Sequence, residues 1–309
     1  MNGFFRRVVG GVCCLVLSAT FVACSARTDK QPSRVESAFG GFDQFRRNVV
    51  LHDVATGAVV SRINDRYRAL ILPYQTTAAV AKLRNEDLAL LFQAAYVAFF
   101  YTVSPGPLHD MQLDLAEMHR RGIAHAGDDA KIYASLIEIR YFGQARAFAK
   151  LHPRAPTEAV PVVTDDHTRH GPTALWVAVG GSKLERRPVD LRNGRIVVVS
   201  SPLCHFSVRA IRSIESDAGL RPLFHDHAVW IVPPDQSTPF STVAKWNRLH
   251  PHEAMAVAYR REEWPTIELW ETPVFYFLRD GRVVSKVVGW PVAGRKAEIR
   301  RSLKRAGLM

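Results

Sequence analysis

The sequence predicts an α/β protein with a mainly helical N-terminal region and a C-terminal domain built on a central mixed sheet flanked by helices. From about Thr77 to Leu151 the apolar residues recur at every third or fourth position, which is the spacing of a helix. From about Thr173 onward, short β-rich runs alternate with helix-like segments, as in strands that helices connect. Hydrophobic residues make up 47% of the chain, enough to form a core in each part.

The charge of the chain limits the classes of partner. The 309 residues carry a formal net charge of +12, and their number suits one large or two ordinary domains. The basic residues are spread along the chain, and no zinc-finger or RNA-binding signature accompanies them. Such a charge could attract anionic lipid, lipopolysaccharide or nucleic acid, but we expect no nucleic-acid partner and interpret it as a solvated basic surface.

Residues 1–24 have the pattern of an export signal. Arg6 and Arg7 precede an apolar stretch, Val8 to Ala23, which is too short and too rich in small residues for a membrane span. The stretch ends at Cys24 and resembles a bacterial lipobox, except that Phe21 stands where leucine is usual.

The lipobox resemblance implies that Cys24 is acylated and becomes the mature N-terminus of a cell-envelope lipoprotein. Ser25 follows where an inner-membrane protein would have aspartate, which implies the outer membrane, with the protein on its periplasmic side. Secretory cleavage near Ala26, which would give a soluble periplasmic protein, is the alternative.

The signal also decides how many cysteines remain. The chain has four, Cys13, Cys14, Cys24 and Cys204, of which the first two leave with the signal. If lipid occupies the sulfur of Cys24, Cys204 has no partner for an internal disulfide. An unpaired thiol in an oxidising compartment is either buried and inert or exposed for a purpose.

The segment after the signal is polar, so residues 25–42 are predicted to be a flexible tether. Two apolar runs around Thr56-Gly57, Val49 to Val54 and Ala58 to Ile63, predict a short hairpin.

Residues 43–155 are predicted to be mainly helical. Apolar residues suit a buried helix from Leu83 to Ala98, a second helix from Leu108 to Gly122, and a third that starts near Asp128 and stops before Pro153. Paired helices of this kind hint at a tetratricopeptide-like array. Because no convincing 34-residue repeat is present, a small helical domain is the preferred interpretation.

The C-terminal region follows a linker, residues 152–172, and contains several predicted strands. Thr173 to Val179 is β-rich, and Ile196 to Ser200 is a continuous apolar run typical of a central strand that is covered on both faces. The next parallel strand is expected at His227 to Val232, followed by a helix at Thr238 to Leu249 and a strand at Ala254 to Tyr259.

Cys204 lies where chemistry is expected. The strand that ends at Ser200 leads through a short loop to Cys204, and an amphipathic helix pattern closed by Gly219 follows. A thiol at a helix N-terminus meets unsatisfied N–H groups and the positive end of the helix dipole, and both stabilise a thiolate. A protonated His205 would add to this effect.

Further on, Thr272-Pro273 opens an apolar run, and Asp280-Gly281 marks a hairpin turn. Together with the strand, cysteine and helix before it, this segment resembles the thioredoxin-like superfamily over residues 173–309. The resemblance implies a cis peptide bond between Thr272 and Pro273, close to Cys204, and a role for Thr272 and Pro273 in binding extended peptides. A final helix is expected from Gly294 to Ala306.

The chain departs from thioredoxins at the second cysteine, because its motif reads Cys-x-x-Ser and ends at Ser207. A serine cannot release a mixed disulfide, so Cys204 would work as a monothiol that needs an outside thiol. The alternative is that Cys204 is a relic on a redox-inactive fold.

No cofactor and no metal are expected. His225, His227, His250 and His252 are interpreted as turn and surface histidines, because no motif typical of a metal site accompanies them.

The predicted function is thiol–disulfide exchange, or a related redox role, through Cys204 with Ser207 and His205. The substrate would be a protein or a small thiol or disulfide. The rival prediction is a non-catalytic lipoprotein that docks a protein partner.

Overall fold

The structure is a computed structural model of the 309-residue chain. It describes residues 31–52, 56–156, 158–165, 171–178, 180–192, 194–234 and 238–309, without the side chains of residues 50–52 and 56–58. The predicted export signal with Cys24, and the first part of the predicted tether, lie outside the described residues. Within the described part, none of the helices combines the length and the apolar character that a membrane crossing requires.

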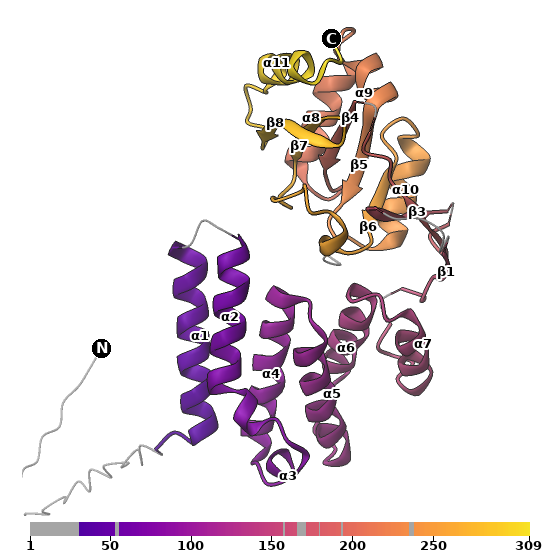
Figure 1. The fold of residues 1–309 in the computed structure, drawn as a ribbon. Coiled ribbons are helices and arrows are strands. Elements are labelled where there is room, and N and C mark those ends of the chain that lie inside the picture. Colours follow the sequence, from indigo (N-terminus) through magenta and orange to yellow (C-terminus); the bar gives the residue numbers. More distant parts are fainter. Residues whose placement is uncertain are drawn as a thin grey trace, which may run out of the picture. The chain divides into compact units, whose positions relative to one another are not determined.

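The chain forms helices first and a sheet afterwards (Figure 1). The N-terminal helices are α1 (Arg34–His52), α2 (Thr56–Leu70), η1 (Leu72–Tyr74), α3 (Thr77–Val80), α4 (Asn85–Thr102), α5 (Pro105–Arg120), α6 (Ala126–Glu138) and α7 (Phe142–Leu151). The strands are β1 (Val162–Asp165), β2 (Thr173–Val177), β3 (Lys183–Pro188), β4 (Arg195–Val199), β5 (Ala228–Val232), β6 (Met255–Ala258), β7 (Val274–Arg279) and β8 (Arg282–Val288). The remaining helices are α8 (His205–Glu215), α9 (Arg221–His227), α10 (Phe240–Leu249), η2 (Arg261–Glu263) and α11 (Lys296–Ala306).

The N-terminal region is mainly helical, as predicted. Consecutive helices pack in pairs, α1 with α2, α4 with α5 and α6 with α7, and α4 also contacts α1 and α2 (Figure 1). The turn between α4 and α5 has clear local causes. Val103 ends α4 in the left-handed region, and Pro105 occupies the first turn of α5, where a missing N–H costs no hydrogen bond.

Two predictions for the start of this region are wrong. The tether predicted at residues 25–42 is helical from Arg34 onward, and the predicted hairpin near Thr56 is part of two helices. Helical spacing explains both corrections, because a helix returns to the same face about every seven residues. The buried residues of α1 stand seven apart, and those that follow in and after α2 stand four apart: Val35, Phe42 and Val49, then Ile63, Tyr67 and Ile71.

The third predicted helix is two helices, because the chain breaks between α6 and α7. Arg140 adopts φ 68°, a left-handed conformation that is uncommon for residues other than glycine. Its buried guanidinium donates hydrogen bonds to the carbonyl oxygens of Tyr259 and Ala258, both at 2.9 Å, and of Pro234 at 3.4 Å. Contacts more than ninety residues away in sequence therefore hold this break in place.

The described strands form one mixed sheet in the order β1-β3-β2-β6-β5-β4-β7-β8. Strands β4, β5 and β6 are parallel, whereas β7 is antiparallel to β4 and β8 is antiparallel to β7. The four strands β5-β4-β7-β8, with α8 and α9 between β4 and β5 and with α11 after β8, have the arrangement expected of a thioredoxin-like domain.

The linker predicted at residues 152–172 is wrong in part. Val162–Asp165 forms β1, an edge strand that pairs in parallel with β3. Neither strand shows a long apolar run in the sequence. Strand β1 has four residues, which alternate between exposed and half-buried, and β3 reads Lys-Leu-Glu-Arg-Arg-Pro. Charged and short edge strands are common protection against unwanted pairing, and they leave little sequence signal.

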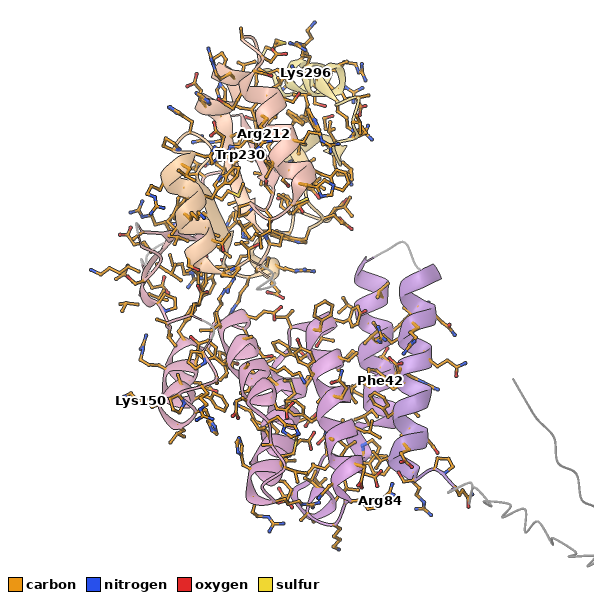
Figure 2. The ribbon with its side chains drawn as sticks, turned by 180° about the vertical axis from the view of Figure 1, so that it is seen from behind. Phe42, Arg84, Lys150, Arg212, Trp230 and Lys296 are labelled. Carbon is orange, nitrogen blue, oxygen red and sulfur yellow. The ribbon has the colours of Figure 1, made fainter. Side chains whose placement is uncertain are left out.

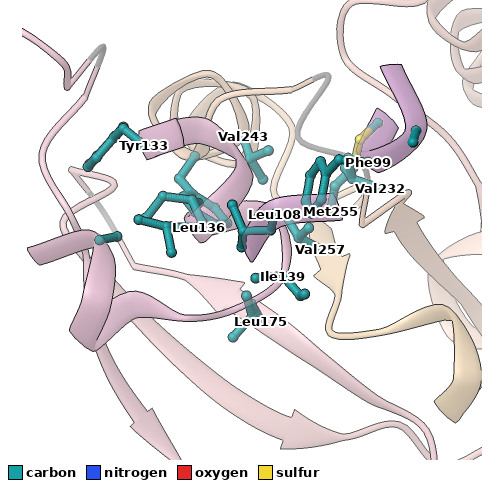
Figure 3. Close-up of a cluster of buried hydrophobic side chains, with 14 of the residues drawn as sticks. Phe99, Leu108, Tyr133, Leu136, Ile139, Leu175, Val232, Val243, Met255 and Val257 are labelled. Atoms are coloured by element: carbon teal, nitrogen blue, oxygen red, sulfur yellow. The ribbon is translucent and has the colours of Figure 1, made fainter. Parts of the chain in front are cut away.

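The central strand β4 confirms the prediction of burial on both faces. Ile196 and Val198 belong to one buried cluster, and Val197 and Val199 belong to the other. The first cluster continues from the sheet into the helices, as Figure 3 shows with Leu136 of α6 and Val257 of β6.

Basic residues occur on several elements, and α11 carries five of them, Lys296, Arg300, Arg301, Lys304 and Arg305. Figure 2 labels Arg84, Lys150, Arg212 and Lys296, which belong to the start of α4, to α7, to α8 and to α11.

Candidate active site

Cys204 occupies the N-cap position of α8, directly after the loop that leaves β4. Its backbone is extended, with φ −87° and ψ 113°, so the helix begins at the following residue, His205. The side chain is partly exposed, and it is the single free cysteine within the part of the chain that the structure describes. The predicted placement of the thiol at a helix N-terminus is confirmed.

Thr272 and Pro273 lie beside this thiol, as the sequence predicts. The peptide bond between them is cis, and Sγ of Cys204 lies 3.3 Å from the carbonyl oxygen of Thr272. The sheet register explains the proximity, because Val199 at the end of β4 pairs with Val274 at the start of β7. The carbonyl of Pro273 accepts a hydrogen bond from the N–H of Gly289, which joins this loop to the end of β8.

The surroundings of the sulfur lower the pKa of Cys204. Partial burial acts in the opposite direction and raises the pKa of the thiol. Hydrogen bonds from the side chain of Thr272, from the N–H and hydroxyl of Ser207 and from the N–H of Phe206 together outweigh the burial. A helix N-terminus offers such N–H groups because they have no partner within the helix.

Ser207 stands where a dithiol thioredoxin has its second cysteine. It is fully buried in the first turn of α8, and its hydroxyl accepts a long hydrogen bond, 3.5 Å, from the N–H of Ser201. The hydroxyl of Ser201 in turn lies 3.0 Å from that of Thr238. Through the backbone and the side chain of Ser201, these two hydrogen bonds link the active-site helix to the segment before α10.

His205 is exposed, and its ring packs against that of Phe206 with 3.8 Å between the centroids. That a protonated His205 stabilises the thiolate of Cys204 stays a prediction.

Sequence reasoning missed the apolar rim of the site. Leu203 and Phe206 flank the thiol and are 61% and 42% exposed. The sequence holds only a weak signal for this rim. Ala210, Ile211 and Ile214 already supply the buried apolar face of α8, so Phe206 is an additional apolar residue that the core does not need. Exposed apolar side chains around a reactive group are typical of a surface that binds another molecule.

The predicted turn and surface histidines lie elsewhere. Cys204 follows the C-terminal end of β4, whereas His225 lies on α9, before the N-terminal end of β5. The strand predicted from His227 to Val232 is β5 and begins one residue later, at Ala228, because Arg221–His227 is helical. Pro222 at the start of α9 supports that helix, since proline suits the first turn.

The assembled site can carry out monothiol chemistry. It offers one partly exposed thiol with a lowered pKa, an apolar rim, a nearby peptide carbonyl and a buried hydroxyl in place of a resolving thiol. The thiolate is the nucleophile in disulfide exchange, so a lowered pKa increases its fraction near neutral pH.

Comparisons with known proteins add one structural likeness. The sequence matches neither a protein-family model nor a curated protein. A thioredoxin-like protein from Bacteroides caccae of known structure is similar at 9% identity and a TM-score of 0.29, over 89% of this chain and 94% of that chain. The order and direction of the strands carry the assignment, and on that basis the C-terminal domain has a thioredoxin-like fold.

Proposed function

We propose that this protein exchanges thiols and disulfides through Cys204 alone. The observation that carries the proposal is the position of Sγ, at the N-cap of α8 and 3.3 Å from the Thr272 carbonyl, in a setting that lowers the pKa of the thiol. The buried Ser207 takes the place of the resolving cysteine, so the chemistry is that of a monothiol.

The proposed reaction has two exchange steps. The thiolate of Cys204 attacks one sulfur of a disulfide, a new bond forms to that sulfur, and the old S–S bond breaks. The other sulfur leaves as a thiolate and takes up a proton. An outside thiol then attacks the mixed disulfide, forms a disulfide with the bound group and returns Cys204 to the thiol state. No net oxidation of the protein occurs in the cycle.

The rim supports a protein or peptide as the main substrate. Leu203 and Phe206 offer apolar contact next to the thiol, and Arg209 lies over the Phe206 ring at 5.9 Å. In thioredoxins, which the chain resembles, the backbone before the cis-proline pairs with extended peptides, and Thr272 holds that position here. Small thiols and disulfides are the second proposed class of substrate, and no cofactor is needed.

The proposed location is the periplasmic side of the cell envelope, with a lipid on Cys24 that anchors the protein, most simply in the outer membrane. The apolar stretch that ends at Cys24 and the serine after it support this location. A soluble periplasmic protein is the alternative. In either case a lone thiol meets an oxidising environment, which favours its capture as a mixed disulfide.

The test is labelling with a small aromatic disulfide at mildly acidic pH. The native protein should become labelled at Cys204 and stay labelled until an outside thiol is added. Cys204→Ala should abolish the label. Ser207→Cys should supply a second thiol and speed the release of the labelling group, where the geometry allows a disulfide. A thiol that reacts only after unfolding would contradict the proposal.

A docking function is the second candidate, and the exposed apolar pair Leu203 and Phe206 favours it. In that case the apolar rim of Leu203 and Phe206 binds a protein partner and Cys204 is not used. Crosslinking in the native envelope separates the two: a disulfide-linked partner that Cys204→Ala abolishes supports exchange. A partner that persists in Cys204→Ala and is lost in a Leu203→Ser, Phe206→Ser double variant supports docking.

A further inference from the structure

A second group of chemically active side chains lies away from Cys204. Glu215 ends α8, His225 lies on α9, and Glu253 belongs to the loop between α10 and β6. One donor atom from each lies within 4.8 Å of the other two. The fold thus brings together two carboxylates and an imidazole from three segments that are up to 38 positions apart in the sequence.

The distances within this group suit a metal ion. Nε2 of His225 lies 3.0 Å from Oε1 of Glu215 and 3.3 Å from Oε1 of Glu253. For a tetrahedral zinc ion with metal–ligand distances of about 2.0–2.2 Å, neighbouring donor atoms lie about 3.3–3.6 Å apart. The observed separations are within a few tenths of an ångström of that range, so small side-chain shifts would admit the ion.

The charges in the group are poorly balanced without a cation. Glu253 is 5% exposed, and its carboxylate faces that of Glu215. Two carboxylates this close need a shared proton or a positive charge between them, and the single Nε2 of His225 cannot donate fully to both.

Further histidines surround the group. The ring of His252 stacks on that of His225, with 4.3 Å between the centroids and 7° between the planes. Nδ1 of His250 lies 3.9 Å from Oε2 of Glu253, which puts His250 within reach of a fourth position. The ring of His250 stacks on that of Trp246, with 3.8 Å between the centroids.

The loop that carries Glu253 is firmly held, as metal sites require. The indole N–H of Trp246 donates to the carbonyl of Glu253 at 2.9 Å. The side-chain amide of Asn247 makes two hydrogen bonds to the backbone of Met255, at 2.8 and 2.9 Å.

We propose that Glu215, His225 and Glu253 bind a zinc ion, with His250 or water as the fourth ligand. The site lies at the N-terminal ends of β5 and β6, whereas Cys204 follows the C-terminal end of β4. The ion joins the end of α8, α9 and the α10–β6 loop and neutralises the paired carboxylates. Its role is to stabilise the thioredoxin-like domain, and it takes no part in the thiol chemistry.

The test uses the full mature chain in a Cys204→Ala background, so that the thiol cannot capture zinc. Zinc binding is measured by calorimetry and elemental analysis after dialysis, and stability by thermal unfolding with and without zinc. We expect one ion at this site and a higher unfolding midpoint with zinc, because a ligand that binds only the folded state stabilises it.

Variants locate the ion. His225→Asn and Glu215→Gln should each weaken zinc binding at least about tenfold. Loss of a residue that only supports a metal ligand already lowers metal affinity by about that factor, and loss of a ligand should cost more. Both residues are partly exposed, so the variants should fold, which circular dichroism checks. His227→Asn, two residues further along α9, is the matched control and should bind zinc as the parent does.

Among the residues that the structure describes, one other group could capture zinc, namely His119, Asp129 and His152 in the helical region. His119→Asn removes a donor from that group and should leave the proposed site intact. Cobalt substituted for zinc should give the visible spectrum of tetrahedral nitrogen and oxygen ligands, and His225→Asn should remove that spectrum. Zinc binding that His225→Asn and Glu215→Gln leave unchanged, or no binding at all, would overturn the proposal in favour of a proton shared between the two carboxylates.

Discussion

Sγ of Cys204 and the carbonyl oxygen of Thr272 lie 3.3 Å apart, so the thiol donates its proton to the backbone just before Pro273. That hydrogen bond exists only while the sulfur is protonated. On ionisation the sulfur becomes an acceptor for the N–H groups of Phe206 and Ser207 and for the Ser207 hydroxyl, which lower the pKa of the thiol. The site therefore has a set of partners for each protonation state.

The first prediction concerns the pH dependence of alkylation. The rate of reaction of Cys204 with iodoacetamide should rise with pH, because only the thiolate attacks. Its midpoint should lie below that of the same thiol in the unfolded chain, since the folded surroundings lower the pKa. Ser207→Ala removes one hydrogen bond to the sulfur and should raise the midpoint. Equal midpoints in the folded and unfolded chains would show that α8 does not stabilise the thiolate.

A matched control separates the hydroxyl of Ser207 from general effects of substitution. Ser216→Ala lies at the other end of α8, where its hydroxyl bonds the carbonyl of Ser213. This variant should leave the alkylation midpoint unchanged.

The features that sequence alone predicted are those with local causes. The run Ile196 to Val199 identifies β4 because a strand that is buried on both faces must be continuously apolar. Cys204 and Thr272-Pro273 were placed together because strand, cysteine and helix precede a proline and hairpin in the order that thioredoxins share. The cis bond and the contact to Thr272 confirm that placement.

The features that sequence alone missed depend on distant partners. The sequence around Arg140 does not indicate a helix break. The carbonyl oxygens that accept hydrogen bonds from its guanidinium belong to distant residues, Pro234, Ala258 and Tyr259. Glu215 and Glu253 carried no metal pattern, since their proximity arises only when α8 and the α10–β6 loop pack against α9. Strand β3, which lies between β1 and β2, was not predicted because its charged residues hide the alternation of apolar and polar positions.

The second prediction concerns the mature N-terminus. Mass spectrometry of the native protein should find Cys24 as the first residue, with a mass that includes acyl chains, and the protein should fractionate with the membrane. Cys24→Ser should release it into the soluble periplasm, because the lipid supplies the anchor. An N-terminus at or beyond Thr28 would contradict the lipoprotein proposal.

The third prediction concerns Arg140. Arg140→Ala removes the donor that serves the carbonyl oxygens of Ala258 and Tyr259 at 2.9 Å. Hydrogen bonds from a charged donor contribute about 1.5–3 kcal/mol each, so the variant should lose about 2–4 kcal/mol in the free energy of unfolding by urea. Arg146→Ala is the control, because its bond to Pro161 is long, 3.5 Å, and partly exposed.

A second substitution separates the backbone of residue 140 from its side chain. Arg140→Gly suits the φ of 68° and relieves any cost of that conformation, but it also removes the guanidinium. It should remain clearly less stable than the native protein. Native-like stability of Arg140→Gly would mean that the hydrogen bonds to the sheet contribute no more than the backbone cost that glycine relieves.

The final prediction concerns a buried carboxyl group in the helical region. Asp114 of α5 is fully buried, and its Oδ2 accepts a hydrogen bond from the side-chain amide of Gln75 at 2.9 Å. Burial raises the pKa of Asp114 to about 8; the Gln75 hydrogen bond opposes this, and the neighbouring Asp110 adds to it. Among the described residues, none offers a hydrogen bond to the other carboxylate oxygen, Oδ1.

The sign of the pH effect follows from this raised pKa. In the unfolded chain Asp114 ionises near its ordinary value of 3.8, whereas the folded protein keeps the proton up to about pH 8. The contribution of Asp114 to stability is thus fully present below about pH 4 and is lost as the pH rises to about 8. Within that window, each rise of one pH unit lowers the contribution of Asp114 to the free energy of unfolding by about 1.4 kcal/mol.

Asp114→Asn should remove this dependence, because an amide stays neutral at every pH and also carries the donor that the carbonyl oxygen of Gln75 lacks. Urea unfolding at pH 5, 6, 7 and 8 checks it. The variant should gain stability relative to the native protein as the pH rises, and the gain should be greatest at pH 8. Asp65→Asn, which replaces an exposed carboxylate on α2, should show no such trend. A constant difference between Asp114→Asn and the native protein across the four pH values would mean that Asp114 is ionised in the folded state throughout.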